Sequence, residues 1–314
     1  MAKGRGAKLI RALGTLDDLN RRVDDLVANQ AALAYALANT TLADFSAPCA
    51  DDPLSSRVCR QADCGLEYAQ WLERLDEPRT VARKEWEHAA ICRALEATGM
   101  LAEGKRGLGF AVGKEPLVAA FAARGVDLVA TDLAVEDPRA AKWASTNQHS
   151  LSLDGLRHPT VCSDQALTEH VSVRATDMNE IGRDLVGFDF VWSACAFEHL
   201  GSIEAGLAFV ERAMDCLVPG GIAVHTTEFN LDSDADTVLE GDTVLFRHRD
   251  LATLAERLAR KGHQMSPLVR GERSGVYDYL IDVSPHHFGT LVVRMEGYRI
   301  TSAVIVVRAN ATST

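Results

Sequence analysis

A glycine-rich turn after a short apolar run is the feature that most limits how this chain can fold. Residues 107–110 read as a buried strand, and Gly109, Ala111 and Gly113 recur at every second position where the strand ends. Side chains are absent or minimal there, as they must be where a backbone passes close to a ligand. Residues 115–124 then read as a helix. The pattern predicts a strand, a ligand-binding turn and a helix.

An acidic residue follows the next predicted strand. Residues 126–131 are mostly apolar, and Asp132 comes directly after them. Its spacing from Gly109 is close to the roughly 20 residues at which a carboxylate reaches the ribose of a bound nucleotide. Ala111 replaces the middle glycine of the dinucleotide fingerprint, and the turn contains no Gly-Lys-Ser/Thr. The turn therefore suits neither NAD nor ATP phosphates well, although an adenosine ligand remains consistent with it.

Further strands follow in the order of an α/β domain. Residues 172–175 precede Asp177 and Met178, residues 188–193 predict a fourth strand, and residues 222–227 predict a fifth. Two β-rich segments near the end of the chain, residues 277–282 and 298–308, predict an antiparallel hairpin. The expected fold is therefore α/β, with a mostly parallel sheet that ends in an antiparallel pair.

With these landmarks in order, the chain resembles the class I S-adenosylmethionine-dependent methyltransferases over roughly residues 105 to 308. The resemblance rests on the glycine turn, Asp132, Asp177-Met178, the strand Phe188-Asp-Phe-Val, Glu198-His-Leu200 and Leu217-Val-Pro-Gly-Gly221. It implies a Rossmann-like sheet and S-adenosylmethionine as the cofactor. The implied cofactor-binding residues are Gly109, Ala111, Gly113, Glu115, Asp132, Leu133, Asp177, Met178 and Ser193.

Within that family, the resemblance assigns parts of the cofactor to parts of the sequence. Asp132 would hold the ribose, Gly109 and Gly113 would admit the methionine portion, and Asp177 with Met178 would contact the adenine. Residues 143–170 either line the pocket near the adenine or form a helix and a surface loop.

A longer set of matches resembles a bacterial methyltransferase group associated with glycosyltransferase and surface-polysaccharide pathways. It includes Gln148-His149, Trp192-Ser193, residues 197–201 and residues 225–230. That resemblance implies O-methylation of a sugar hydroxyl on a glycan or a glycosylated small molecule. N- or C-methylation of a natural product is the alternative enzymatic hypothesis. A catalytically idle cofactor-binding scaffold that acts through its N-terminal helix is the hypothesis from another class.

Two clusters at the predicted ends of strands four and five supply the catalytic candidates. Open α/β sheets bind ligands at these strand ends, and a sulfonium methyl group needs little beyond alignment and a base. We therefore consider His199, His225 and Glu228 as catalytic residues, with either histidine as a general base that needs no metal. The structural alternative is that Glu198 and His199 cap a helix and hydrogen-bond the fifth strand.

A metal-assisted mechanism is a further alternative. Glu198-His199 resembles the metal-binding Glu-His pair of ubiquinone-pathway O-methyltransferases and small-RNA 2′-O-methyltransferases, so Glu198, His199 and His225 would hold Mg²⁺ or Zn²⁺. Cys195 stands where those families have another glutamate, which argues against a site for a hard metal ion.

The first third of the chain divides into two predicted segments. In residues 1–45, steps of three and four link the positions Leu16, Leu19, Val23, Leu26, Gln30, Leu33 and Leu37. This heptad pattern predicts a coiled coil that makes a homo-oligomer, or else a helix that lies on its own core. Residues 46–104 predict a helical cap over the cofactor site, and residues 105–310 predict the methyltransferase domain.

Composition narrows the class of protein and its partners. The chain has 314 residues and a net charge of −11, which argues against nucleic acid as a partner and favours a small molecule or a glycan. No apolar run approaches the roughly 20 residues needed to span a bilayer, and the basic positions within residues 3–11 precede no signal-type apolar stretch, so we expect a cytoplasmic protein.

The cysteines and one late loop leave alternatives open. Seven cysteines form no paired CxxC motif, so reduced thiols are expected. The alternative is a zinc cluster of Cys49, Cys59 and Cys64 with His88 or Cys92. The histidine-bearing residues 284–288 either face the acceptor or form a plain connection.

Overall fold

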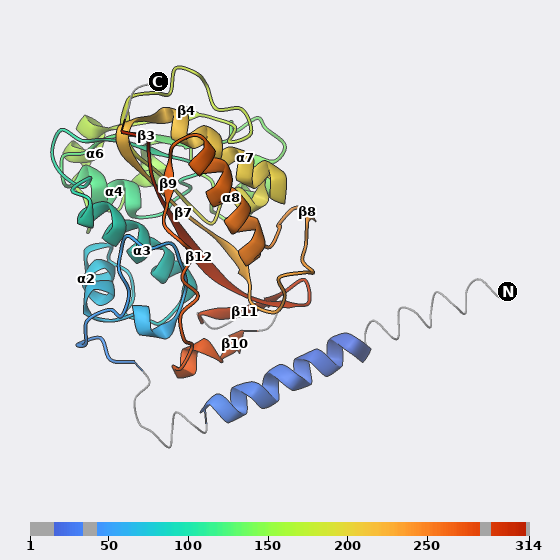
Figure 1. The fold of residues 1–314 in the computed structure, drawn as a ribbon. Coiled ribbons are helices and arrows are strands. Elements are labelled where there is room, and N and C mark those ends of the chain that lie inside the picture. Colours follow the sequence, from blue (N-terminus) through green and yellow to red (C-terminus); the bar gives the residue numbers. More distant parts are fainter. Residues whose placement is uncertain (1–15, 34–42, 283–289, 312–314) are drawn as a thin grey trace.

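The computed structural model describes residues 16–33, 43–282 and 290–311, which contain one large mixed sheet flanked by helices (Figure 1). The hydrogen-bonded strand order is β10-β11-β12-β7-β5-β2-β3-β4, and β1 and β9 each pair with β12. The strands are β1 (Arg57–Val58), β2 (Arg106–Gly109), β3 (Asp127–Asp132), β4 (Val171–Ala175), β5 (Phe188–Ala194), β7 (Leu217–Asn230), β9 (Gln264–Met265), β10 (Ile281–Asp282), β11 (Val292–Met295) and β12 (Tyr298–Arg308).

The strand directions confirm the predicted fold class. Strands β4, β3, β2, β5 and β7 are parallel, whereas β12 is antiparallel to both β7 and β11. This is the Rossmann-like order of the class I methyltransferase sheet, with an antiparallel C-terminal pair. The predicted pairing of residues 277–282 with 298–308 needs correction, because the hairpin partner of β12 is β11, and β10 runs parallel to β11.

Helices cover both faces of this sheet (Figure 1). Alternate residues of β5 point to opposite faces: Phe190 and Trp192 enter the core with α2, α3 and α4, whereas Val191 enters the core with α7 and α8. The helices are α2 (Leu66–Arg74), α3 (Arg83–Ala97), α4 (Leu117–Ala122), α5 (Ala140–Ser145), α6 (Asp164–His170), α7 (Ile203–Ala213) and α8 (His248–Arg260).

Short elements complete the connections. They are the 3-10 helices η1 (Gln61–Asp63), η2 (Asp154–Leu156), η3 (Phe197–His199), η4 (Met214–Cys216) and η5 (Val276–Asp278), and the two-stranded sheet of β6 (Gly201–Ser202) and β8 (Glu240–Gly241). Ser202 begins α7, because its side-chain oxygen accepts a hydrogen bond from the backbone N–H of Ala205 at 3.1 Å.

Residues 46–104 share the core of the sheet. Strand β1 pairs with β12, and α3 packs against β5, β7 and β12. On α3, Trp86 and Ile91 are buried in the core. The helix also carries buried polar residues, among them Glu87 and His88. The segment predicted as a cap, residues 46–104, thus packs directly on the sheet of the segment predicted as the methyltransferase domain, residues 105–310.

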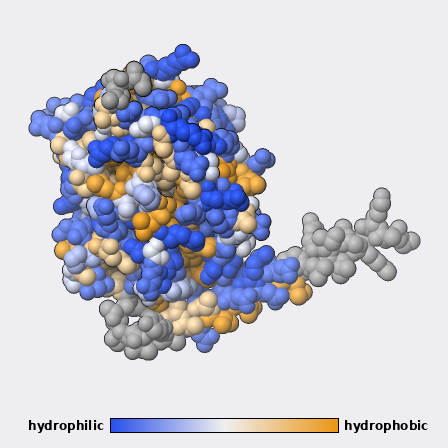
Figure 2. All heavy atoms as spheres, viewed as in Figure 1, coloured by the Kyte–Doolittle hydropathy of each residue, from blue (hydrophilic) through white to orange (hydrophobic). Residues whose placement is uncertain are grey.

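The N-terminal helix, residues 16–33, contacts the sheet edge through a polar face. Asn29 exchanges two hydrogen bonds with the backbone of Ile281 in β10, at 2.8 Å and 2.6 Å, and Asp25 pairs with Arg294. The heptad positions Leu16, Leu19, Val23, Leu26 and Leu33 are exposed, and Figure 2 shows hydrophobic side chains along this helix. Leu37 and the basic residues before position 12 lie outside the described residues, as does the 284–288 loop.

Two further sequence expectations meet the structure here. No described helix is long and apolar enough to cross a membrane. All seven cysteines are free, and within the described ranges the zinc cluster of Cys49, Cys59 and Cys64 does not form a metal-binding group. Burial raises the pKa of Cys59 and of Cys64 well above the ordinary thiol value, which keeps both as neutral core thiols.

Candidate active site

A cavity of about 810 Å³ opens at the carboxyl ends of β2, β3 and β5. In the sheet, β2 lies between β3 and β5. The chain runs outward from β2 through β3 and β4 on one side and then returns to β5 on the other, so the cavity lies where the strand order reverses. Open α/β sheets bind their ligands at this position, because the connections diverge there and leave a crevice. The cavity is therefore the first candidate for a cofactor and substrate site.

The turn after β2 forms one wall of the cavity. Ala111 and Gly113 line it, and both have the left-handed backbone conformation, with φ of +48° and +52°. A Cβ atom on Gly113 would lie 2.3 Å from the backbone oxygen of Gln148, so only glycine fits that position. The absent side chain at Gly113 therefore makes room for the backbone of Gln148, and the predicted approach of a ligand to this turn stays a prediction.

Two predicted cofactor residues lie elsewhere. Gly109 is inside β2, where a Cβ atom would come within 2.4 Å of the Trp192 ring, so the absent side chain makes room for the core. Ser193 is fully buried, and its Oγ lies 2.8 Å from Nδ1 of His225. Neither residue lines the cavity, which corrects their predicted contact with the cofactor.

Asp132 ends β3 at the cavity wall, as its sequence position predicted. Its carboxylate accepts hydrogen bonds from the backbone N–H groups of Leu133 at 2.8 Å and Gly113 at 3.2 Å. Burial raises the pKa of Asp132, although these backbone donors oppose the shift. The bonds fix the carboxylate against the glycine turn, while Asp132 and Leu133 both line the cavity.

Asp177 and Met178 line the opposite part of the same cavity. They follow β4, beside the neighbouring strand β3 that carries Asp132. Arg139 donates a hydrogen bond to the Asp177 carboxylate at 2.7 Å, and Met178 is buried. The structure therefore brings an apolar side chain and two carboxylates to one cavity, as the adenosine-site prediction requires.

Helix α3 contributes two cationic side chains that sequence reasoning did not assign to the cofactor site. Lys84 Nζ and His88 Nε2 each lie 3.4 Å from Oε1 of Glu115, and all three residues line the cavity. Burial opposes the charge of His88, but Glu115 and Glu77 together raise its pKa to about 10. Lys84 and His88 are four residues apart and thus share a helix face, which was the available sequence signal.

His199, in η3, lines the part of the cavity that also contains Trp143 and Asp242. Its ring packs against Trp143 with centroids 4.5 Å apart, and its Nδ1 lies 2.8 Å from the backbone oxygen of Asp242. Burial lowers the pKa of His199, so the neutral ring is favoured. An Nδ1–H that donates to the Asp242 carbonyl leaves Nε2 as an acceptor.

His225 does not share that position, which corrects its prediction as a base or metal ligand beside His199. It is fully buried beside the rings of Phe197 and Phe209, with centroid distances of 6.2 Å and 5.4 Å, and it does not line the cavity. Burial lowers its pKa to about 3. Among the described residues, Glu198, His199 and His225 form no metal-binding group.

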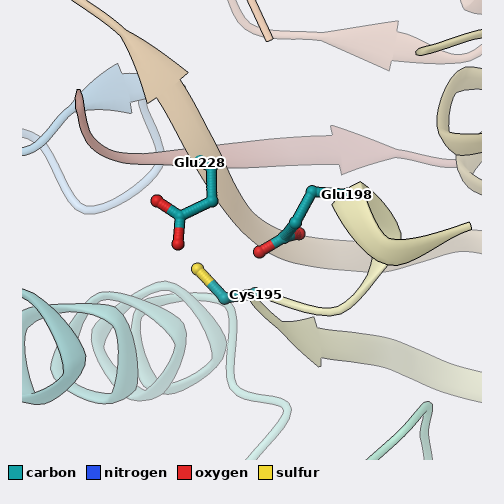
Figure 3. A group of neighbouring side chains, drawn as sticks. All are labelled: Cys195, Glu198 and Glu228. Atoms are coloured by element: carbon teal, nitrogen blue, oxygen red, sulfur yellow. The ribbon is translucent and has the colours of Figure 1, made fainter. Parts of the chain in front are cut away.

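A different set of side chains meets beside the cavity, formed by Cys195, Glu198 and Glu228 (Figure 3). One ligand atom from each residue lies within 4.8 Å of the others. Cys195 lines the cavity, whereas Glu228 is buried behind it and forms an ion pair with Arg83 of α3. Glu228 therefore lies beside Cys195 but does not line the cavity.

The sheet order and the cavity define a Rossmann-like α/β protein with the class I methyltransferase topology. No protein-family model matches the sequence, and no curated protein matches it either. Solved structures that match part of the chain include magnesium protoporphyrin IX methyltransferase from Synechocystis PCC 6803 with bound SAH, at 10% identity and a TM-score of 0.43 over 77% of this chain and 94% of that chain. The CcbJ methyltransferase from Streptomyces caelestis is another, at 14% identity and a TM-score of 0.38 over 68% and 92% of the two chains.

Proposed function

We propose that this chain is an S-adenosylmethionine-dependent methyltransferase. The observation that carries the proposal is the convergence of Asp132, the Gly113 turn, Asp177-Met178 and His199 on one cavity at the reversal of the strand order. These residues fit the cofactor by chemistry. A carboxylate beside the turn suits ribose hydroxyls, and the apolar Met178 suits an adenine face.

The methionine end of the cofactor fits the α3 side of the cavity. Lys84 and His88 supply positive charge beside the turn, and Glu115 lies between them. Lys84 and His88 could pair with the carboxylate of an amino acid, and Glu115 could pair with its ammonium group. The set therefore suits the zwitterionic end of the methionine portion. Bound S-adenosylmethionine would supply the activated methyl group.

His199 is the base that this geometry supports for an alcohol acceptor. Its Nδ1 contacts the Asp242 carbonyl, which orients the ring and leaves Nε2 to accept the proton of a hydroxyl group. Alignment of the hydroxyl oxygen with the methyl group supplies much of the remaining acceleration. Glu228 is held by Arg83 behind the cavity and is assigned no contact with the acceptor.

We further propose a sugar hydroxyl on a glycan or glycosylated small molecule as the acceptor. The acceptor side joins the Trp143 ring to polar groups of Lys142, His199 and Asp242. A flat apolar face surrounded by hydrogen-bonding groups suits a sugar ring, which has apolar C–H faces and a polar rim. A neutral amine attacks through its own lone pair, so an N-methyl acceptor would not need a base oriented like His199.

The test is methyl transfer from S-adenosylmethionine to matched sugar, amine and carbon acceptors, followed by mass spectrometry. Methylated sugar products are expected. His199→Ala should lower turnover roughly 10²- to 10⁴-fold with cofactor affinity retained, because it removes the base alone.

His170→Ala is the control, since His170 pairs with Asp127 away from the cavity. Transfer to amines alone would overturn the sugar assignment. Unchanged turnover in His199→Ala would overturn the assignment of the base.

A further inference from the structure

The group of Cys195, Glu198 and Glu228 has no role in the proton transfer assigned to His199. Cys195 follows β5, Glu198 lies in η3, and Glu228 lies near the end of β7. Figure 3 shows the sulfur and the two carboxylates turned toward one another. Across the described ranges, this is the one set of three or more such side chains whose ligand atoms come within 4.8 Å of one another.

The carboxylate of Glu198 gives an independent indication that a cation belongs here. The side chain is fully buried, and Thr227 Oγ1 donates a hydrogen bond to Oε2 at 3.1 Å. The other oxygen, Oε1, is buried without a hydrogen-bond partner, and Nε2 of His199 lies 3.9 Å from it, beyond hydrogen-bond distance. A carboxylate oxygen removed from water is costly unless it is paired, so an unpaired one points to a missing partner.

The nearby cations already have carboxylate partners. Arg83 pairs with Glu228, and Lys84 lies 3.0 Å from Oε2 of Glu87 and 3.4 Å from Oε1 of Glu115. Arg83 contacts Oε2 of Glu228, which leaves Oε1 of the same carboxylate for a further ligand. The positive charges of Arg83 and Lys84 also offset part of the negative charge of the nearby carboxylates. A divalent ion would therefore add to a site that already contains paired charges of both signs.

We propose that Cys195, Glu198 and Glu228 bind a zinc ion beside the cavity. Thiolate and carboxylate are both zinc ligands, whereas Mg²⁺ and Ca²⁺ favour oxygen alone. Three protein ligands with one open position are typical of catalytic zinc, and Cys195 connects the group to the cavity. Arg83 supports the set by orienting Glu228.

The consequence for catalysis rests on the proposed methyltransferase function. A zinc ion held by these ligands would lie beside His199, whose Nε2 is 3.9 Å from Glu198 Oε1, and would supply a Lewis acid for the acceptor oxygen. The ligand set differs from one built on His199 and His225, because His225 lies in the aromatic core. Binding of the ion itself can be measured without the cofactor or an acceptor, so the two proposals fail separately.

The test uses full-length, tag-free protein stripped with a chelator and titrated with Zn²⁺ by calorimetry and with Co²⁺ by absorbance. We expect one tight site per chain and a thiolate-to-cobalt charge-transfer band. Cys195→Ser should abolish the band, and both Cys195→Ser and Glu198→Gln should weaken Zn²⁺ binding by more than the roughly 10- to 100-fold cost of losing a supporting residue.

Cys216→Ser is the matched control, because Cys216 is also a free thiol but lies at the opposite end of β7 from Glu228. It should keep both the band and the affinity, and circular dichroism should show that each variant is folded. Absence of Zn²⁺ binding by the wild-type chain would overturn the proposal. So would a Cys195→Ser variant with unchanged affinity and an unchanged cobalt spectrum.

Discussion

At the scale of the residue, Gly109 at the end of β2 and Gly113 in the turn after it are required for different reasons. Gly113 combines a φ of +52° with a Cβ position 2.3 Å from a backbone oxygen, whereas Gly109 has a Trp192 ring where its Cβ would be. Backbone cannot move aside as easily as a side chain. The absent side chain of Gly113 therefore accommodates the Gln148 backbone beside the cavity, and that of Gly109 accommodates the core.

These reasons predict different costs of substitution. Gly113→Ala should lower the free energy of unfolding by more than the roughly 1–2 kcal/mol expected for a left-handed alanine alone, because it also displaces Gln148. Gly99→Ala is the control, since its φ is +71° and nothing lies within 4 Å of its Cβ position. Urea denaturation measures both. Equal losses for the two variants would contradict the tight turn.

Burial of His225 predicts a dependence of stability on pH. Desolvation alone lowers its pKa from 6.5 to about 3, so the folded state holds the neutral ring and the unfolded state binds a proton below pH 6.5. Stability attributable to this residue is complete above pH 6.5. It should fall by about 1.4 kcal/mol for each pH unit as the pH drops toward 3.

Denaturant unfolding of wild type and His225→Asn at pH 7.5 and pH 5 tests this. The substitution should remove part of the loss at pH 5, whereas His248→Asn on the exposed start of α8 should not. An identical pH dependence in wild type and His225→Asn would show that burial of this histidine does not set the dependence.

The same residues show what could be predicted from the sequence. Asp132 and Asp177 were found because each follows a strand, and strand ends of a parallel sheet meet at one edge. His225 was misplaced because alternate strand residues face opposite sides, and the sequence alone did not show which side held the cavity. Lys84 and His88 were missed because the docking of α3 depends on distant strands.

At the scale of the element, the sequence predicted strands and helices that depend on neighbouring residues. It did not predict pairs of strands that are far apart along the chain. The five parallel strands could be located along the chain from the apolar runs and their turns, whereas their order within the sheet was implied only by the family resemblance. The pairing of β11 with β12 was missed because β11 has only four residues, Val292–Met295, whereas residues 277–282 are a longer run with two tyrosines and an isoleucine. The addition of β1 to β12 also depends on contacts far apart in sequence.

The helix of residues 16–33 carries a prediction at this scale. Its Asn29 face meets β10, and its heptad face is exposed, with Leu19 at 59% and Leu26 at 60% exposed. We propose that this face pairs with a second copy of the helix, because a stripe of apolar positions interrupted by one polar residue is the pattern of a coiled-coil seam.

Leu19→Asp with Leu26→Asp should reduce the solution mass to that of a monomer, because charges would enter the seam. Val186→Asp is the control, since Val186 is also an exposed apolar residue but lies outside the helix. Light scattering of the full-length chain measures the mass. A wild-type monomer, or an unchanged assembly in the double variant, would contradict helix pairing.

At the scale of the whole molecule, the fold places two kinds of chemistry at one cavity. Strands β2, β3 and β4 end beside the glycine turn and the carboxylates assigned to the cofactor, whereas β5 and η3 carry Cys195 and His199 toward the acceptor. Helix α3 closes the cavity between these two sides with Lys84 and His88. The net charge of −11 favours a small or neutral acceptor over nucleic acid.

Calorimetric titration with S-adenosylmethionine tests the central claim most directly. Wild-type protein should bind one molecule per chain, and Asp132→Asn should weaken binding roughly 10- to 100-fold, because a charged hydrogen bond contributes about 1.5–3 kcal/mol. Asp137→Asn, at a residue outside the cavity lining that forms a partly exposed pair with Arg139, should have a smaller effect. Absence of binding by the wild-type chain, or equal affinity in Asp132→Asn, would contradict the assignment of this cavity to the cofactor.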